Sequence, residues 1–233
     1  MDRETFMRDY WAYYLMLEDK FIDTTNYVTL AEDNYGTYSN EYAALMQMIG
    51  GELDSFFKVY CLTKRKKDEF EEKLENDNKK NLEKKIEKVS NKHLDIRFYK
   101  EYILETYPEI IEQEVKVRSA NIGFCPFRIW KENDSKRDET AEVKQNFATV
   151  KRKTWWRAFT DVKHNRSSSK KDANQRNTLY LLGALYLLEM KYLKDITEKS
   201  GGRDIPDKES NLFTLDGWET KYSSMRDIYF KRV

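Results

Sequence analysis

One amphipathic stripe constrains the fold of this chain more than any other sequence feature. Between residues 40 and 61, large apolar side chains recur at the spacing of one helix face. The stripe consists of Tyr42, Leu45, Met46, Ile49, Leu53, Phe56, Phe57 and Tyr60. Ser39 precedes it and is a residue type that caps helix N-termini well. The pattern predicts a helix over 40–61 whose apolar face packs into a core.

The same periodicity predicts the other helices of the chain. They are expected over 5–30, 95–106, 150–164 and 173–196, and Asp172 is the expected cap of the last one. The chain has only 8 Gly and 3 Pro in 233 residues, too few turn residues for a sandwich or barrel. We therefore expect an all-α fold, an up-and-down helical bundle of about 4–5 core helices.

Two insertions interrupt this bundle. Residues 64–92 are almost entirely Lys, Glu, Asp and Asn, which predicts a long charged helical element, either a solvated face or a partner-binding arm. Residues 108–147 include an alternating stretch and an aromatic stretch, which predict a small β-hairpin or an irregular loop, followed by a polar linker over 131–147. The tail, 200–233, is expected to dock as a short helix. All of this forms one expected domain, 1–233.

Several functional classes are disfavoured by the sequence. The apolar run 179–188 is too short to span a bilayer and predicts a buried helix, so no membrane association is expected. Cys61 and Cys125 are expected to be free thiols of a cytoplasmic protein. His93 and His164 are the only histidines, and no Cys/His set has zinc spacing. We therefore expect neither a metal site nor a cofactor.

Positive charge is concentrated between residues 151 and 176, which hold nine Lys or Arg and two Asp. Such a patch attracts phosphate groups. The alternative interpretation is a solvated loop at a helix end. The candidate nucleic-acid-binding residues are Lys151, Arg152, Lys153, Lys170, Lys171 and Arg176.

The helix expected over 150–164 carries the candidate site. On a helical wheel Trp155, Phe159 and Val162 share one side, while Arg157 and His164 fall within about 20° of each other on the opposite side. Asp161 lies between those two and is expected to orient the imidazole. Arginine binds phosphate through a planar fork of donors, and histidine exchanges a proton near neutral pH. Together they supply what metal-free RNA cleavage needs.

A purely structural interpretation of this helix stays open. Arg157 and Asp161 then form an ordinary i,i+4 ion pair, and His164 interacts with the carbonyl groups at the helix end. Glu52 falls inside the apolar arc of its own helix, where a carboxylate is expected to be paired or functional. Arg166 is the candidate partner for Glu52.

The order of these residues resembles the HEPN superfamily. An Arg, six intervening residues and a His precede an aliphatic helix over 179–193, as in that family. The chain is similar in particular to uncharacterised bacterial HEPN-like proteins. The similarity rests on Tyr38-Ser-Asn-Glu-Tyr42, Gly-Glu52-Leu-Asp54 with Lys58, Pro126-Phe127 with Trp130, and Trp155-Trp156 with Val-Lys163-His164-Asn-Arg166.

The resemblance implies a compact helical homodimer in which two Arg–His faces meet and form one metal-independent endoribonuclease site. Arg157 would bind phosphate, His164 would be the acid and base, and Lys163 and Asn165 would support them. Such proteins commonly act in toxin–antitoxin or anti-phage defence, which implies an antitoxin-like protein partner. Ala158 departs from the pattern, since active members usually carry a polar residue there. The alternative function is a catalytically inactive HEPN-like module that binds nucleotide, RNA or a protein.

Overall fold

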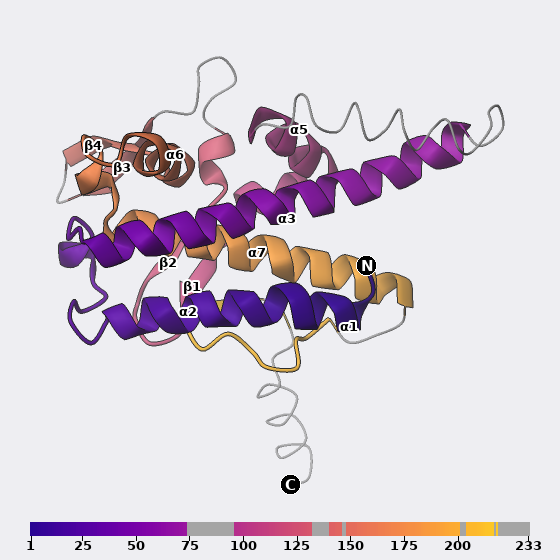
Figure 1. Ribbon diagram of the computed structural model, residues 1–233, viewed down its shortest axis with the longest axis horizontal. Helices are drawn as coiled ribbons and strands as arrows, with labels where there is room; N and C mark the ends of the chain where they lie inside the picture. The colour runs from indigo at the N-terminus through magenta and orange to yellow at the C-terminus, as the bar shows by residue number, and fades with distance from the viewer. Residues whose placement is uncertain (74–95, 132–139, 146–147, 201–203, 217, 219–233) are drawn as a thin grey trace, which may run out of the picture. The chain divides into compact units, whose positions relative to one another are not determined.

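The computed structural model describes residues 1–73, 96–131, 140–145, 148–200, 204–216 and 218. The chain divides into two compact units, one formed by 1–50 with 111–233 and the other by 51–110. The described elements are mainly helical with a small antiparallel sheet, so the expected helical class is confirmed (Figure 1). None of the described helices is both long and apolar enough to cross a membrane. The expected single domain, 1–233, stays a prediction.

The N-terminal helical segment consists of three consecutive helices. These are α1 (Arg3–Phe6), a π-helical turn (Met7–Trp11) and α2 (Ala12–Thr24). Asp2 caps the segment, since its Oδ1 accepts a hydrogen bond from the Thr5 amide at 2.8 Å. The helix expected over 5–30 is therefore too long at its end. After Thr24 the chain turns, because the Tyr27 and Val28 amides both donate back to the Thr24 carbonyl.

Helix α3 (Asn40–Lys73) confirms the amphipathic stripe. Ser39 Oγ accepts a hydrogen bond from the Tyr42 amide at 3.0 Å, which is the expected N-cap. All eight stripe residues are buried. The helix extends beyond residue 61 into the charged element expected over 64–92, whose remainder from residue 74 lies outside the described residues.

Helix α7 (Gln175–Ser200) packs against α1, α2 and α6 (Trp155–Asn165) (Figure 1). Every residue from Leu181 to Met190 is buried, as the apolar run predicted. Asn174, not Asp172, caps α7, because Asn174 Oδ1 accepts from the Asn177 amide at 2.9 Å. Asp172 belongs to a short 3-10 helix (Lys170–Asp172) before it.

A three-stranded antiparallel sheet joins the insertion to the tail. Strands β1 (Val115–Val117) and β2 (Gly123–Phe124) form the expected hairpin, and a 3-10 helix (Arg128–Trp130) follows. Strand β5 (Phe213–Leu215) pairs with the other edge of β1, from Val115↔Leu215 to Val117↔Phe213. The short helix expected in the tail is therefore wrong for 213–215, where alternate apolar side chains are buried against the fold.

A second, two-stranded sheet overturns part of the expected linker. Strands β3 (Thr140–Gln145) and β4 (Ala148–Lys153) are antiparallel, and Val143 lies opposite Val150. The helix expected from residue 150 therefore begins only at Trp155. β-Branched residues that alternate with charged ones favour an extended chain over a helix.

The second unit contains α5 (Ile96–Thr106), which confirms the helix expected over 95–106. Tyr99 and Ile103 are buried, and the rings of Phe57 and Tyr99 stack with centroids 4.9 Å apart. Pro108 opens a 3-10 helix (Pro108–Ile111), as expected for a residue that fixes its own backbone angle.

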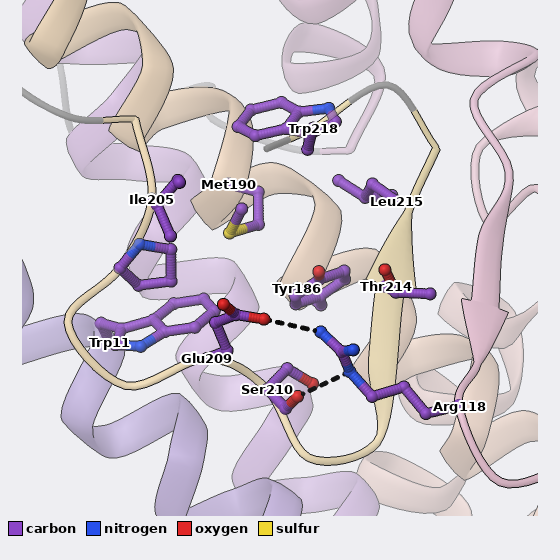
Figure 2. A pocket seen from close by; sticks show the side chains of 11 residues that line it. Trp11, Arg118, Tyr186, Met190, Ile205, Glu209, Ser210, Thr214, Leu215 and Trp218 are labelled. Atoms are coloured by element: carbon purple, nitrogen blue, oxygen red, sulfur yellow. Dashed lines mark hydrogen bonds and ion pairs between the residues drawn. The ribbon is translucent and has the colours of Figure 1, made fainter. Parts of the chain in front are cut away.

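Residues 205–215 of the tail bind to the start and middle of the chain. Arg118 donates to the Ser210 carbonyl at 3.0 Å and forms an ion pair with Glu209 (Figure 2). It also donates to the Phe213 carbonyl at 2.9 Å. The buried Glu18 carboxylate accepts hydrogen bonds from Tyr14 Oη at 2.6 Å, the Asn211 amide at 2.8 Å and Ser210 Oγ.

The cavity of Figure 2 lies beside these contacts and is walled by Trp11, Tyr186 and Met190. Its volume of about 20 Å³ leaves room for about one water molecule. This cavity is therefore too small for a ligand, and the tail is held by the contacts around it.

Candidate nucleic-acid interface

Helix α6 is anchored by its aromatic side. Thr154 caps it, because its Oγ1 accepts from the Arg157 amide at 3.2 Å. Trp155, Phe159 and Val162 are buried, as the helical wheel predicted. Trp155 Nε1 donates to the Pro126 carbonyl at 2.7 Å. These contacts fix the rotation of α6 about its own axis and so decide which of its polar residues face outward.

Close packing on α3 fixes α6 further. A Cβ atom built on Gly50 would lie 2.3 Å from the Phe159 ring, so only a glycine allows this approach. The neighbouring Gly51 has open space around it. Gly50 therefore matters for the position of α6, and Gly51 does not.

The first half of α6 holds a compact charged cluster. Asp161 is only 7% exposed, so it does not lie on the outer face as expected. Its carboxylate oxygens are 2.8 Å from Lys153 Nζ and 3.0 Å from Arg157 Nε. Lys153 Nζ also lies 2.7 Å from an Asp172 oxygen. Among the described residues the Asp161 carboxylate thus pairs with two cations, rather than with the imidazole of His164.

The pKa shifts of Asp161 and Lys153 agree with their pairing. Partial burial acts to raise the pKa of Asp161, but the hydrogen bonds and charges of Lys153 and Arg157 outweigh it and lower the pKa. Partial burial likewise acts to lower the pKa of Lys153, and Asp161 and Asp172 raise it overall. Both shifts favour the charged forms of Asp161 and Lys153, so the cluster sets two cations against two carboxylates.

The second half of α6 and the turn after it present a different surface. We call residues 163–171 the basic end of α6. Ser168 and Ser169 amides donate to the Asn165 carbonyl at 3.1 and 3.0 Å and shape the turn. No Asp or Glu occurs in this segment. Its exposed side chains include four cations, the histidine and one asparagine: Lys163, Arg166, Lys170, Lys171, His164 and Asn165.

The other residues predicted to bind nucleic acid lie elsewhere. Arg176 is buried, with its guanidinium 4.3 Å from the Tyr180 ring centroid and a hydrogen bond to Asn177, so it does not belong to this surface. Lys151 and Arg152 are residues of β4, and their side chains lie outside the described residues.

Glu52 is half-buried on α3, and burial raises the pKa of its carboxyl. Arg166, the partner expected from the sequence, is exposed at the end of α6. Their pairing stays a prediction.

The arrangement can bind anions without a metal. The cations of the first half of α6 are neutralised within the chain, whereas the four of the basic end face solvent with no acidic residue in their segment. Over the described residues, no three His, Cys, Asp or Glu side chains gather as metal ligands would.

Comparison with protein-family models, curated proteins and solved structures finds no match for this chain. The resemblance to HEPN proteins therefore rests on the motifs quoted from the sequence.

Proposed function

We propose that this chain is a cytoplasmic HEPN-like protein, an up-and-down helical bundle that binds RNA through the basic end of α6. One observation carries the proposal. The two acidic residues of the segment 151–176 are both paired with Lys153 or Arg157. Lys163, Arg166, Lys170 and Lys171 are exposed, and within the described residues no ion pair joins them to an acid.

The number of phosphate contacts determines how strongly the RNA affinity depends on salt. Each cation that neutralises a phosphate of a single strand releases counterions, with a slope of about −0.7 in log K against log salt per contact. Four contacts therefore lower the affinity about 50-fold between 50 and 200 mM salt. The RNA complex is expected to be this sensitive to salt.

The proposal is tested by binding of a labelled RNA, followed by fluorescence anisotropy. The variant Lys170→Gln/Lys171→Gln removes two charges from the basic end. The matched control, Lys131→Gln/Lys208→Gln, removes two equally exposed charges elsewhere. We expect the first variant to weaken binding about 10-fold and to reduce the salt slope by about 1.4, while the control stays within about 2-fold. Equal losses in both variants would contradict a localised interface.

A second function, metal-independent RNA cleavage by a homodimer, has an observation in its favour. Arg157 keeps 41% of its side chain exposed despite its pairing, and His164 is exposed seven residues later on the same face. Seven residues of helix rise about 10 Å, which leaves room for a phosphate between them. Such activity would fit a role in toxin–antitoxin or anti-phage defence with an antitoxin-like partner.

Cleavage is tested in EDTA with His164→Ala, and the control is His93→Ala, which changes the other histidine. Loss of acid–base catalysis is expected to lower the cleavage rate about 100-fold or more in the first variant only. A solution mass measurement checks the dimer that the shared site needs. If the wild type binds RNA and leaves it intact, binding alone is the function.

A further inference from the structure

A cavity of about 420 Å³ opens between the end of α2 and the start of α3. Its wall combines the aromatic and apolar side chains of Tyr27, Val28 and Tyr42 with polar groups that include Lys20 and Glu41. Small-molecule sites are clefts of about 300–1,000 Å³ with mostly apolar walls and a few polar groups. The cavity therefore has the size and the lining of a site for a small planar ligand.

Tyr27 is the most unusual residue of this wall, because it is 90% exposed. Its backbone is nevertheless fixed, since the Tyr27 and Val28 amides donate to the Thr24 carbonyl at 3.1 and 3.0 Å. By contrast, Tyr42 is buried in the cavity floor against the Phe21 ring. A tyrosine held out in solvent at the edge of a cavity is a ready stacking platform for a nucleobase.

The cavity adjoins the basic end of α6 through a short chain of hydrogen bonds. The amide of Ser39, a residue of the cavity wall, donates to the Ala173 carbonyl at 3.2 Å, and the Ala173 amide donates to the Lys170 carbonyl at 3.3 Å. Beside them, Tyr38 forms a β-bridge with Asn174 and is 47% exposed. A single RNA strand whose phosphates lie on the basic end of α6 can therefore extend towards the cavity.

We propose that this cavity is a nucleobase subsite that accepts one unpaired base of the RNA, with Tyr27 stacking on the base. The subsite rests on the proposed RNA binding, because the phosphates of the same strand lie on the basic end of α6. Bases within a duplex are stacked and paired, so only a single strand can supply the base.

The polar rim gives the subsite a preference among bases. Asp23 and Glu41 are carboxylates that accept hydrogen bonds, and they suit the exocyclic amino groups of adenine, cytosine and guanine. Uracil has no such amino group. The subsite therefore favours any of these three bases over a uracil.

The test compares an adenine decamer of RNA with inorganic polyphosphate of similar charge, both measured by displacement of a labelled RNA. Tyr27→Ala is expected to weaken the decamer about 10-fold and to leave polyphosphate unchanged, while Tyr27→Phe keeps both affinities. Tyr13→Ala is the matched control, since it removes another exposed tyrosine, one that lies on α2 and outside the cavity wall.

Three outcomes would overturn the subsite. If Tyr27→Ala binds the decamer like the wild type while Lys170→Gln/Lys171→Gln does not, the subsite is wrong and the RNA-binding function stands. If Tyr27→Ala weakens both polyanions equally, Tyr27 supports charge placement and stacks on no base. If the wild type binds neither polyanion, the subsite and the proposed function fail together.

Discussion

The two halves of α6 both carry cations, but they present opposite surfaces. In the first half, Arg157 lies against Asp161, and Lys153 reaches both Asp161 and Asp172. In the second half, Lys163 and Arg166 are exposed, and no acidic residue occurs in the segment 163–171. A count of charge treats these cations alike, yet only the second group faces solvent without an acid in its own segment.

The position of two aspartates, and not the number of lysines, therefore decides which cations are paired within the chain. Both aspartates pair with the same lysine at the end of β4. That pairing holds the 3-10 helix before α7 against α6 and so shapes the turn that carries Lys170 and Lys171. The ion pairs of Lys153 with Asp161 and Asp172 thus position the basic end of α6.

The largest expected effect concerns the buried side that both halves share. In Gly50→Ala the new Cβ collides with the Phe159 ring and displaces α6, which we expect to lower the free energy of unfolding by about 3 kcal/mol. The control Gly51→Ala meets nothing and is expected to stabilise its helix by about 1 kcal/mol. Urea unfolding measures both. Equal stability of the two variants would show that α6 is not fixed by this contact.

Asp161→Asn makes the first half of α6 more like the basic end, because it removes the carboxylate that pairs with Arg157 and Lys153. We expect a loss of about 2 kcal/mol in the free energy of unfolding, together with a 2- to 3-fold gain in RNA affinity, roughly one extra cation. The control Asp54→Asn breaks an exposed i,i+4 pair with Lys58 and is expected to cost at most about 0.5 kcal/mol. RNA affinity unchanged in Asp161→Asn would mean that the released cations do not reach the RNA.

Acid weakens the first half of α6 selectively. The pKa of Asp161 is lowered in the folded chain, so its ion pairs stabilise the fold above the unfolded value of about 3.9. This stabilisation is lost as the pH falls through the lowered pKa. We expect the difference in unfolding free energy between wild type and Asp161→Asn to be largest near neutral pH and to shrink as the pH falls from about 5 to 3. A difference that does not change with pH would contradict the pairing.

Lys163→Gln is expected to have the smallest effect and tests the contribution of a single cation of the basic end of α6. Its ammonium lies 5.6 Å from the Phe159 ring centroid, and the side chain is exposed. Loss of one phosphate contact is expected to lower RNA affinity 2- to 3-fold and the salt slope by about 0.7, with stability within about 0.5 kcal/mol of wild type. Anisotropy at several salt concentrations checks this against Lys131→Gln.

Sequence periodicity predicts the helices well, because the apolar face of a helix is formed by residues that lie three or four positions apart in the chain. The stripe that includes Tyr42 and Tyr60 and the buried side of α6 with Trp155 follow directly from the spacing of large side chains. The burial of Asp161 does not follow, because on the helical wheel it lies about 100° from Val162, outside the apolar arc. Lys153 and Asp172, which come from other elements, decide its place.

The strands were harder to predict for a different reason. Strand β5 has three residues, and its partner Val115 lies about a hundred positions earlier in the chain, so no local pattern identifies the pair. In β3 and β4 the many charged residues indicate a linker. The alternation of valines with charged residues identifies strands only once Val143 is known to lie opposite Val150. Asn174 was identifiable as a cap from its residue type, but Asp172 lies two residues before it and is a capping type as well.

The Glu18 carboxylate sets an order for folding during synthesis. The ribosome makes Glu18 almost two hundred residues before Ser210 and Asn211, which donate to it in the folded chain. A carboxylate without these donors resists burial, so α2 cannot settle into its final place on a nascent chain. Helix α2 thus reaches its final packing only after residues 210 and 211 have been translated.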